Sequence, residues 1–443
     1  MSLSQCDVCT APRATGRAAR RAAHCATRLA VFAVASVLAL SAPGLVAQGL
    51  PTATPAEVGM DAEALARIGP AMQTFIDEGR TAGVMTMVAR DGRIVHWDAR
   101  GWAVLDEDPL ERDDVFRIYS MTKPVTSVAV MMLVEDGLLS LDSEVREIIP
   151  AFGDVEVYVD GDTSRPPDRP ITIRDLLSHT AGLTYGLFGT TPVDSLYLAT
   201  APYDIVNGRG LAETADALAA LPILDDPGDL WNYSMATDVL GRVVEVVSGM
   251  SLETFFAERI FAPLGMEDTA FEVQEDDLDR FTAVYSPGPA GLVVSDPLDG
   301  PFTRAPSWPS GGGGLVSDAS DYIRFAQMLL NDGELDGVRI LEEETVRAMR
   351  TNILPDELMP IGVLGGPDTG FGLGFAIETG ERAGTYWWLG AASTHFWIDP
   401  VEELVMFVWT QYQPVAGSGV HLAFPPLVYD ALVESNREEA GGR

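Results

Sequence analysis

The chain has 443 residues, and its 65 acidic side chains against 29 basic ones give a formal net charge of -36. Nearly half of the residues are hydrophobic and charged residues form no long blocks, which is typical of a globular protein and excludes a disordered one. The negative field repels nucleic acid and anionic lipid, so we expect neither as a partner and interpret the scattered acids as a hydrated surface.

The N-terminus has the organisation of a secretory signal peptide. Residues 1–28 hold five arginines and one acid, the uncharged stretch Leu29–Leu40 follows, and small residues lead to Ala47. We therefore predict a signal peptide over residues 1–47, cleaved near Ala47, and a secreted or periplasmic protein. A membrane association would require an uncleaved segment, and twelve residues are few for crossing a bilayer. All three cysteines lie in this part of the chain, so we expect no disulfide in the processed protein: Cys6, Cys9 and Cys25.

The first elements after residue 55 are a helix, a hairpin and a second helix. Apolar spacing predicts the helices, and a turn of Arg90, Asp91 and Gly92 between two β-branched runs predicts the hairpin. The expected ranges are Asp61–Glu78 for the first helix, Val84–Val88 and Arg93–Trp97 for the strands, and Thr126–Glu135 for the second helix.

The middle of the chain is predicted to be mostly helical, and strands return only near the end. Residues 157–170 have the composition of a solvated polar turn, and the glycine run Ser310–Gly314 that of a flexible loop without the sequence of a phosphate loop. The expected helices are Thr237–Val247, Leu252–Ile260, Asp318–Asn331 and His421–Ser435, and the expected strands are Thr385–Leu389, Thr394–Ile398 and Leu404–Thr410.

This order of elements predicts an α+β fold. Strands from both ends of the chain would form one antiparallel sheet flanked by helices, with a mainly helical domain inserted between them. We predict a catalytic domain over residues 55–437, whose α/β part comprises 55–125 and 315–437 and whose helical insertion comprises 126–314.

Ser120 and Lys123 are the candidate nucleophile and base. They are three residues apart where a polar stretch becomes a helix, so both would lie on one helix face. A serine hydroxyl attacks only when a neighbouring base takes its proton, and a lysine can do so when it is neutral. Lys123 is the only lysine in the chain, and the other 28 lysine-or-arginine positions are arginine. Arginine cannot act as this base, because it keeps its proton at working pH. The Ser-x-x-Lys spacing is nonetheless common, and a helix cap followed by a surface lysine is the alternative.

Tyr233 is a candidate for the proton transfer to the leaving group. It lies just ahead of the expected helix Thr237–Val247, where its hydroxyl could reach the serine, although ordinary half-buried packing would also explain it. His179 and His395 suggest a catalytic triad, but the chain has no Gly-x-Ser-x-Gly sequence, and we assign both histidines structural roles. No cluster has metal-ligand spacing, so we expect no metal and no cofactor.

Several segments in a fixed order resemble the serine β-lactamase and penicillin-binding protein superfamily, above all class C β-lactamases and family VIII carboxylesterases. The resemblance extends from Glu57 to the C-terminus. It rests on Ser120–Lys123, Asp175–Leu183, Tyr233–Met235, Phe261–Met266, Ser310–Ser317 and Trp388–Pro400.

This resemblance implies a β-lactamase/transpeptidase-like fold and a role for each catalytic group. Ser120 would be the acylated nucleophile, Lys123 its base, and Tyr233 the shared acid and base. The backbone N–H groups of Ser120 and Ala391 would form the oxyanion hole. The residues expected to line the substrate site are Tyr119, Met235, Trp388, Leu389 and Gly390.

Two departures from the β-lactamase pattern point to esters as substrates. Met235 stands where such enzymes carry an asparagine that binds the substrate amide. Trp388-Leu389-Gly390 stands in place of Lys-Thr-Gly, so the groups that hold a substrate carboxylate are missing. The sequence therefore predicts a metal-independent carboxylesterase for small neutral esters. The alternatives are a β-lactamase, a D-Ala-D-Ala carboxypeptidase or D-amino-acid amidase with the same machinery, and a non-catalytic binding protein of this fold.

Overall fold

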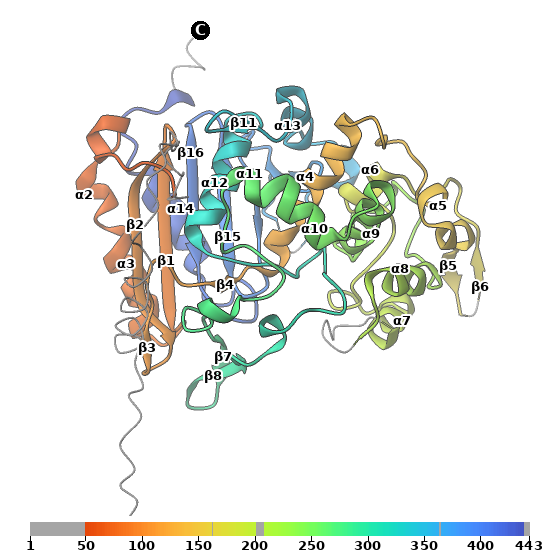
Figure 1. Ribbon diagram of the computed structural model, residues 1–443, viewed down its shortest axis with the longest axis horizontal. Helices are drawn as coiled ribbons and strands as arrows, with labels where there is room; N and C mark the ends of the chain where they lie inside the picture. Colours follow the sequence, from red (N-terminus) through yellow and green to blue (C-terminus); the bar gives the residue numbers. More distant parts are fainter. Residues whose placement is uncertain (1–48, 162, 201–207, 363–364, 438–443) are drawn as a thin grey trace, which may run out of the picture.

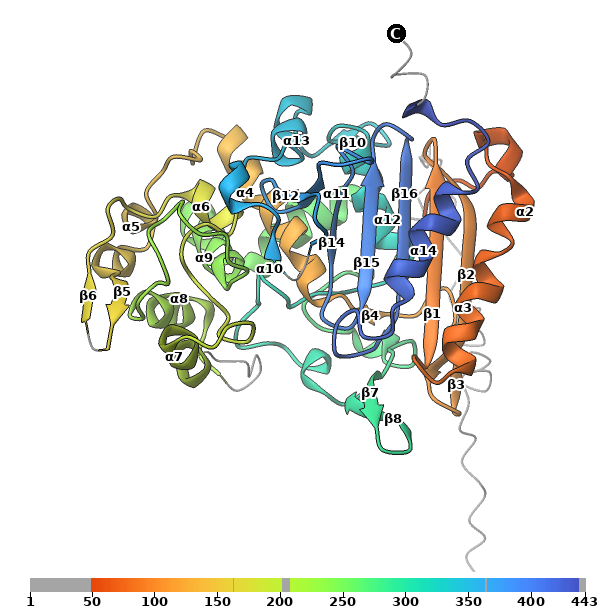
Figure 2. The same cartoon turned by 180° about the vertical axis from the view of Figure 1, so that it is seen from behind.

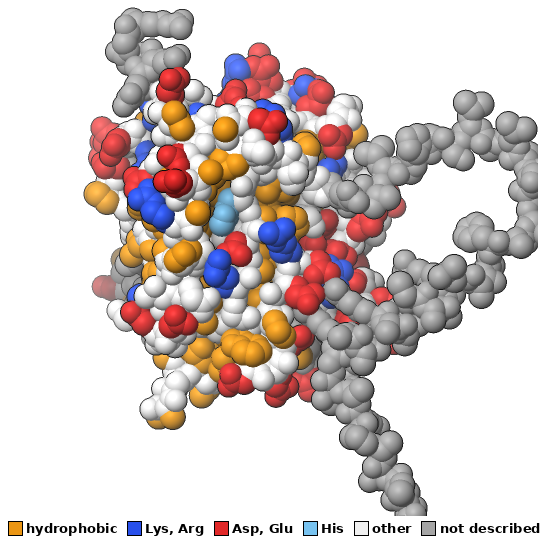
Figure 3. All heavy atoms as spheres, turned by 90° about the vertical axis from the view of Figure 1, so that its left-hand side faces the viewer, with side chains coloured by type: hydrophobic (Ala, Val, Ile, Leu, Met, Phe, Trp, Pro, Cys, Tyr) orange, Lys and Arg blue, Asp and Glu red, His pale blue; other side chains and the backbone are white. Residues whose placement is uncertain are grey.

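A computed structural model describes residues 49–161, 163–200, 208–362 and 365–437. The predicted signal peptide, residues 1–47, lies outside this part of the chain. Within the described residues, no helix combines the length and the apolar character needed to cross a bilayer. On the face shown in Figure 3, acidic and basic side chains alternate with hydrophobic ones.

An antiparallel sheet of eight strands organises the molecule (Figure 1). Its spatial order is β12-β13-β14-β15-β16-β1-β2-β3, so the first strands of the chain pair with the last, and Met85 of β1 lies opposite Trp409 of β16. This confirms the predicted α+β class with one sheet built from both ends. The strands are β1 (Gly83–Arg90), β2 (Arg93–Val104), β3 (Asp108–Pro109), β12 (Thr369–Phe371), β13 (Ala376–Glu378), β14 (Tyr386–Leu389), β15 (Thr394–Asp399) and β16 (Leu404–Trp409).

Helices cover the two faces of this sheet unequally. α2 (Ala62–Leu65), α3 (Ile68–Asp77) and α14 (Val420–Tyr429) pack on one face, against β1 and β16 (Figure 2). On the other face α12 (Ala319–Leu330) contacts β15 and β16, and α4 (Thr122–Glu135) joins the sheet to the helical block. The helical block therefore meets the sheet on the α4 side, which is where a site between the two parts can form.

The helical block is built around α9, which contacts α4, α6, α8 and α10. Its core is continuous with that of the sheet, since one hydrophobic cluster includes side chains from both. The division of the domain at residues 126 and 314 stays a prediction. The remaining helices are α5 (Val145–Ile148), α6 (Ile173–Leu177), α7 (Pro192–Thr200), α8 (Leu211–Ala219), α9 (Ala236–Ser248), α10 (Leu252–Phe256), α11 (Ala262–Leu264) and α13 (Glu343–Met349).

Short two-stranded ladders complete the structure, and one of them corrects the sequence analysis. Residues 157–170 were expected to be a polar turn, yet β5 and β6 pair within this stretch, and the Tyr158 N–H also donates to the carbonyl of Ile223 in the helical block. The ladders are β4 (Phe116–Arg117) with β9 (Val316–Ser317), β5 (Val157–Asp160) with β6 (Thr163–Arg165), β7 (Val284–Gly288) with β8 (Gly291–Asp296), and β10 (Glu334–Leu335) with β11 (Val338–Arg339).

The other expected elements are found with shifted ends. The first hairpin is confirmed, and Asp91 and Gly92 in its turn both have positive φ, as such tight hairpins require. The expected helix Asp61–Glu78 is divided into α2 and α3, and the last helix ends at Tyr429 rather than at Ser435.

The glycine run Ser310–Gly314 is a packed turn, which corrects the expectation of a flexible loop. It is largely buried against α9, and a Cβ atom added to Gly311 would lie 2.8 Å from the Thr237 carbonyl oxygen. At Gly312 the added atom would overlap the carboxylate of Asp238, which accepts hydrogen bonds from the Gly312 N–H (2.9 Å) and the Ser310 hydroxyl (2.6 Å). Glycine is therefore needed here for close backbone approach.

Gly312→Ala is expected to lower the free energy of unfolding by about 1–3 kcal/mol, because the new methyl group forces Asp238 to move in a closed core. Urea denaturation would measure the change. Gly153→Ala is the matched control, since its added atom would meet nothing closer than 3.9 Å. Equal stability of the two variants would show that the turn adapts freely.

Candidate active site

Ser120 and Lys123 lie together at the start of α4, as the sequence predicts. Ser120 is in the short 3-10 helix Tyr119–Met121, and Lys123 follows in the first turn of α4. One turn of helix brings the Lys123 Nζ to 3.4 Å from the Ser120 Oγ. The lysine is 1% exposed, so its amine is withdrawn from water beside the hydroxyl.

Two further groups fix the amine of Lys123. Its Nζ is 2.6 Å from the Gly312 carbonyl oxygen and 2.8 Å from the Tyr185 hydroxyl. The rings of Tyr185 and Tyr233 flank it, with centroids at 5.2 Å and 4.7 Å. The Lys123 amine therefore has three oxygen atoms within hydrogen-bonding distance, and one of them is the Ser120 Oγ.

Tyr233 reaches the same serine from the helical block. It precedes α9, and its hydroxyl donates a hydrogen bond of 2.7 Å to the Ser120 Oγ. The structure thus joins Ser120, Lys123 and Tyr233 across 113 residues of sequence. The Oγ has a phenol on one side and an amine on the other, which is the arrangement that general acid–base catalysis on a serine requires.

Tyr119 is turned away from this group of three. Its backbone has a φ of 42°, in the left-handed region, where a side chain other than glycine is strained. The hydroxyl donates to Asp296 (2.9 Å), and the ring meets Phe302 edge-on at 5.4 Å. Burial, reinforced by the Asp296 charge, raises the pKa of Tyr119. These contacts hold the strained residue that precedes the nucleophile, and its predicted part in substrate binding stays a prediction.

The end of β14 forms the wall opposite α4. Trp388 is 1% exposed, and its ring lies 5.3 Å from that of Tyr233. Gly390 follows, and a Cβ atom there would overlap the Ile118 carbonyl, so this strand end packs directly against the chain that leads to Ser120. Ala391, the second predicted oxyanion donor, is the next residue, in the turn to β15. The oxyanion hole stays a prediction, supported by this close approach.

Met235 and Leu389, also predicted to line the substrate site, lie in different surroundings. Met235 is fully buried in the main core at the start of α9, so its side chain serves packing. Leu389 is 8% exposed and borders a groove together with Phe188, whose ring is 5.8 Å from that of Tyr233. Leu389 and Phe188 therefore give this part of the candidate site an apolar border, and the predicted roles of Met235 and Leu389 in substrate binding stay predictions.

His179 supports the site instead of taking part in it. Its ring is buried, its Nδ1 is 3.2 Å from the Ser234 hydroxyl, and its edge meets the Tyr233 ring at 5.1 Å. Burial, and then the charge of Lys123, hold the pKa of His179 well below its usual range. The imidazole is therefore neutral at pH 7 and orients the segment that carries Tyr233. Our assignment of a structural role agrees with these contacts.

Sequence reasoning missed Tyr185 and Asp238. Tyr185 comes two residues after the segment Asp175–Leu183, whose likeness to the superfamily was already noted, but no spacing rule connects it to Lys123. Burial raises the pKa of Asp238, and the nearby charge of Lys123 opposes that effect. An aspartate in the otherwise apolar start of α9 is a signal that could have been noticed.

Among the described residues, one group of three acids comes close enough to share a cation: Asp225, Asp226 and Asp229. Asp226 is already paired with the guanidinium of Arg165 and accepts a hydrogen bond of 2.7 Å from the Asp168 N–H. These contacts give Asp226 a structural role, and the group carries no metal assignment.

Comparison with known proteins agrees with this geometry. The family described as Beta-lactamase matches residues 68–423. "Protein Rv1367c" of Mycobacterium tuberculosis is 37% identical over 356 residues, which are 76% of this chain and 88% of that protein. "Esterase EstB" of Burkholderia gladioli is 31% identical over 393 residues, covering 82% and 95%. The solved structure of "EstCE1, a hydrolase with promiscuous acyltransferase activity" superposes with a TM-score of 0.71 at 29% identity, covering 84% of this chain and 99% of that one.

His179→Gln should make the stability less dependent on pH. The folded pKa of His179 is depressed below 6.5, so below pH 6.5 the unfolded chain takes up a proton that the native state refuses, and stability falls as the pH falls. One such histidine contributes up to about 1.4 kcal/mol per pH unit. Urea denaturation at pH 8, 6 and 5 should show a shallower decline in the variant, and parallel declines would contradict the argument. The comparison at pH 8 isolates any cost that does not depend on pH.

Proposed function

Because the chain belongs to the beta-lactamase family, we propose that it is an exported carboxylesterase that acts on small neutral esters through an acyl-enzyme at Ser120. A single observation carries the proposal: the Ser120 Oγ is 2.7 Å from the Tyr233 hydroxyl and 3.4 Å from the Lys123 amine. The relatives named as an esterase and as a hydrolase support the reaction class.

Acylation would begin when the Ser120 Oγ attacks the ester carbonyl while its proton passes to the lone pair of Lys123. The C–O bond to the alcohol then breaks, and the Tyr233 hydroxyl gives its proton to the departing alkoxide. Lys123, now an ammonium group beside the Tyr233 ring, returns a proton to the phenolate. The net result is an ester on Ser120 and a free alcohol, with both bases restored.

Deacylation would run the same sequence with water as the nucleophile. The backbone N–H groups of Ser120 and Ala391 would stabilise the oxyanion in both steps, since preorganised donors in a closed site cost no reorganisation during the reaction. The buried lysine and the aromatic rings around Tyr233 exclude bulk water from the amine. That exclusion strengthens the electrostatic effect of each donor.

Esters are favoured over β-lactams by the apolar wall. Trp388 packs on Tyr233 and Phe371, and Leu389 and Phe188 both line the groove. Trp388, Leu389 and the two phenylalanines carry neither the cation nor the hydroxyl that would bind a substrate carboxylate. A carboxylated substrate would leave its charge without a partner at this wall, which is a large penalty.

We expect Ser120→Ala to abolish hydrolysis of p-nitrophenyl butyrate and Lys123→Arg to slow it about 10²- to 10⁴-fold, because arginine keeps its proton. Initial rates of p-nitrophenol release would be measured for both. Arg347→Lys, on exposed α13, is a control that should retain full activity. Normal rates in either active-site variant would refute the mechanism. Faster turnover of nitrocefin than of the ester would assign the same machinery to β-lactams. Absence of a fluorophosphonate adduct on Ser120 would favour a binding protein.

Export is a separate part of the proposal and rests on the N-terminal sequence alone. The arginine-rich residues 1–28, the stretch Leu29–Leu40 and the small residues before Gln48 are its motive. Expression of the full chain in a bacterial host should give an extracytoplasmic protein whose intact mass corresponds to a start at Gln48. A cytoplasmic product of full-length mass would contradict both the export and the cleavage.

A further inference from the structure

A groove of about 760 Å³ lies on the sheet face that carries α14. α14 covers β16 and β1 through Val420, Phe424 and Val428 but leaves the outer surface of β14 and β15 open beside it. The volume falls within the range of small-molecule sites. The groove is thus a cavity on the face of the sheet opposite α12.

One end of the groove adjoins the candidate active site. Successive strand residues point to opposite faces, so Trp388 faces Tyr233 while Leu389 faces the groove. Phe188, whose ring is 5.8 Å from that of Tyr233, also lines the groove. The side chains of Leu389 and Phe188 therefore form the border between the groove and the candidate catalytic site.

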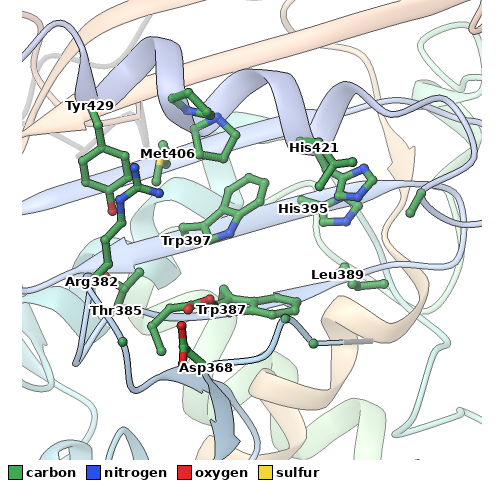
Figure 4. Close-up of a pocket in the computed structure, with 18 of the residues that line it drawn as sticks. Asp368, Arg382, Thr385, Trp387, Leu389, His395, Trp397, Met406, His421 and Tyr429 are labelled. Atoms are coloured by element: carbon green, nitrogen blue, oxygen red, sulfur yellow. Dashed lines mark hydrogen bonds between the residues drawn. The ribbon is translucent and has the colours of Figure 1, made fainter. Parts of the chain in front are cut away.

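Aromatic side chains from β14, β15 and α14 line the groove (Figure 4). Trp387 and Trp397 are paired across β14 and β15. His395 stacks on Trp397, with ring centroids 5.5 Å apart and planes inclined by 14°, and on His421, at 4.8 Å and 11°. His395 is thus held between two nearly parallel rings, and the half-buried indole of Trp397 is the part of this group that can receive a flat hydrophobic ligand.

His395 adds a polar requirement to this surface. Its side chain is 2% exposed, and among the described residues neither of its ring nitrogens has a hydrogen-bond partner of suitable geometry. Burial lowers the pKa of His395 to about 3, so the ring is neutral and offers one donor and one acceptor. A buried polar group without a partner is unfavourable, and a ligand hydroxyl or carbonyl would relieve that cost.

We propose that this groove binds the distal, flat hydrophobic part of a larger ester. This distal part carries a hydroxyl or carbonyl group that points toward His395. The scissile bond of the ester reaches Ser120 past Leu389 and Phe188. This inference rests on the proposed esterase function and extends its substrates from small neutral esters to larger ones with a flat distal group. The scissile end of the ester lies at Ser120 and its ring lies on Trp397. The length of the linker between these two parts therefore determines whether the ester can occupy both sites at once.

A series of p-nitrophenyl ω-(2-naphthyl)alkanoates with linkers of increasing length tests the groove. Wild type should show an optimum linker, with kcat/KM at least tenfold above that for p-nitrophenyl butyrate. Trp397→Ala should remove this advantage and leave the butyrate rate unchanged, while Trp397→Phe should retain most of it. Trp97→Ala is the matched control, a half-buried tryptophan on β2, outside the groove. Absence of an optimum, or equal loss on both substrates, would overturn the inference.

Binding without turnover separates this inference from the proposed function. Fluorescence titration of the full-length protein with ω-(2-naphthyl)alkanoic N-methylamides should give a Kd at least tenfold weaker in Trp397→Ala than in wild type. A ligand with a 6-hydroxyl on the naphthalene should bind several-fold tighter than its parent, and His395→Phe should abolish that difference. Inactivity toward butyrate with intact binding would reject the esterase alone. Equal binding by wild type and Trp397→Ala would reject the groove alone.

Discussion

The amine of Lys123 is the point on which the rest of the site depends. It contacts the Ser120 hydroxyl, the Tyr185 hydroxyl and the Gly312 carbonyl, and each partner comes from a different part of the chain. A buried amine that lost any of these contacts would keep an unsatisfied polar group at the catalytic centre. The Lys123 nitrogen therefore fixes three segments relative to one another: the start of α4, the loop before α7 and the turn after the helical block.

The glycine run shows how backbone geometry serves this constraint. The Gly312 carbonyl can face Lys123 for two reasons. The N–H of Gly312 donates to Asp238, and no side chain separates the turn from α9. Burial raises the pKa of Asp238 in the first turn of α9, and the charge of Lys123 together with the hydrogen bonds from Ser310 and Gly312 opposes that rise. Asp238 and Lys123 are thus linked through the two backbone groups of a single residue, Gly312.

The alternation of side chains along β14 places two different surfaces at one point of the sheet. Trp388 closes the catalytic side against Tyr233 and Phe371, while Leu389, one residue on, faces the opposite surface. Because α14 is centred on β16 and β1, that surface remains open over β14 and β15. Trp388 and Leu389, although adjacent in sequence, therefore belong to two environments, the wall of the candidate active site and the border of the groove.

The sequence alone determined those features that depend on interactions between residues close together in the chain. The Ser120–Lys123 pair follows from one helical turn, the first hairpin from the Asp91-Gly92 turn, and the α+β class from strands at both ends of a helical block. The ordered segments were sufficient to identify the family, and the solitary lysine made Ser120 the candidate nucleophile.

Only the tertiary structure decided which distant groups meet. Tyr233 lies 113 residues from Ser120, and Tyr185 62 residues from Lys123, so no periodicity relates them. The glycine run was expected to be a flexible loop because a glycine-rich composition indicates conformational freedom. Composition does not show that a neighbouring segment packs so closely that no Cβ atom fits. In the same way the strands β5 and β6 were not expected, and β5 also bonds to Ile223, which is more than 60 residues along the chain. Packing between remote segments sets these features, and it is not encoded in any short stretch of sequence.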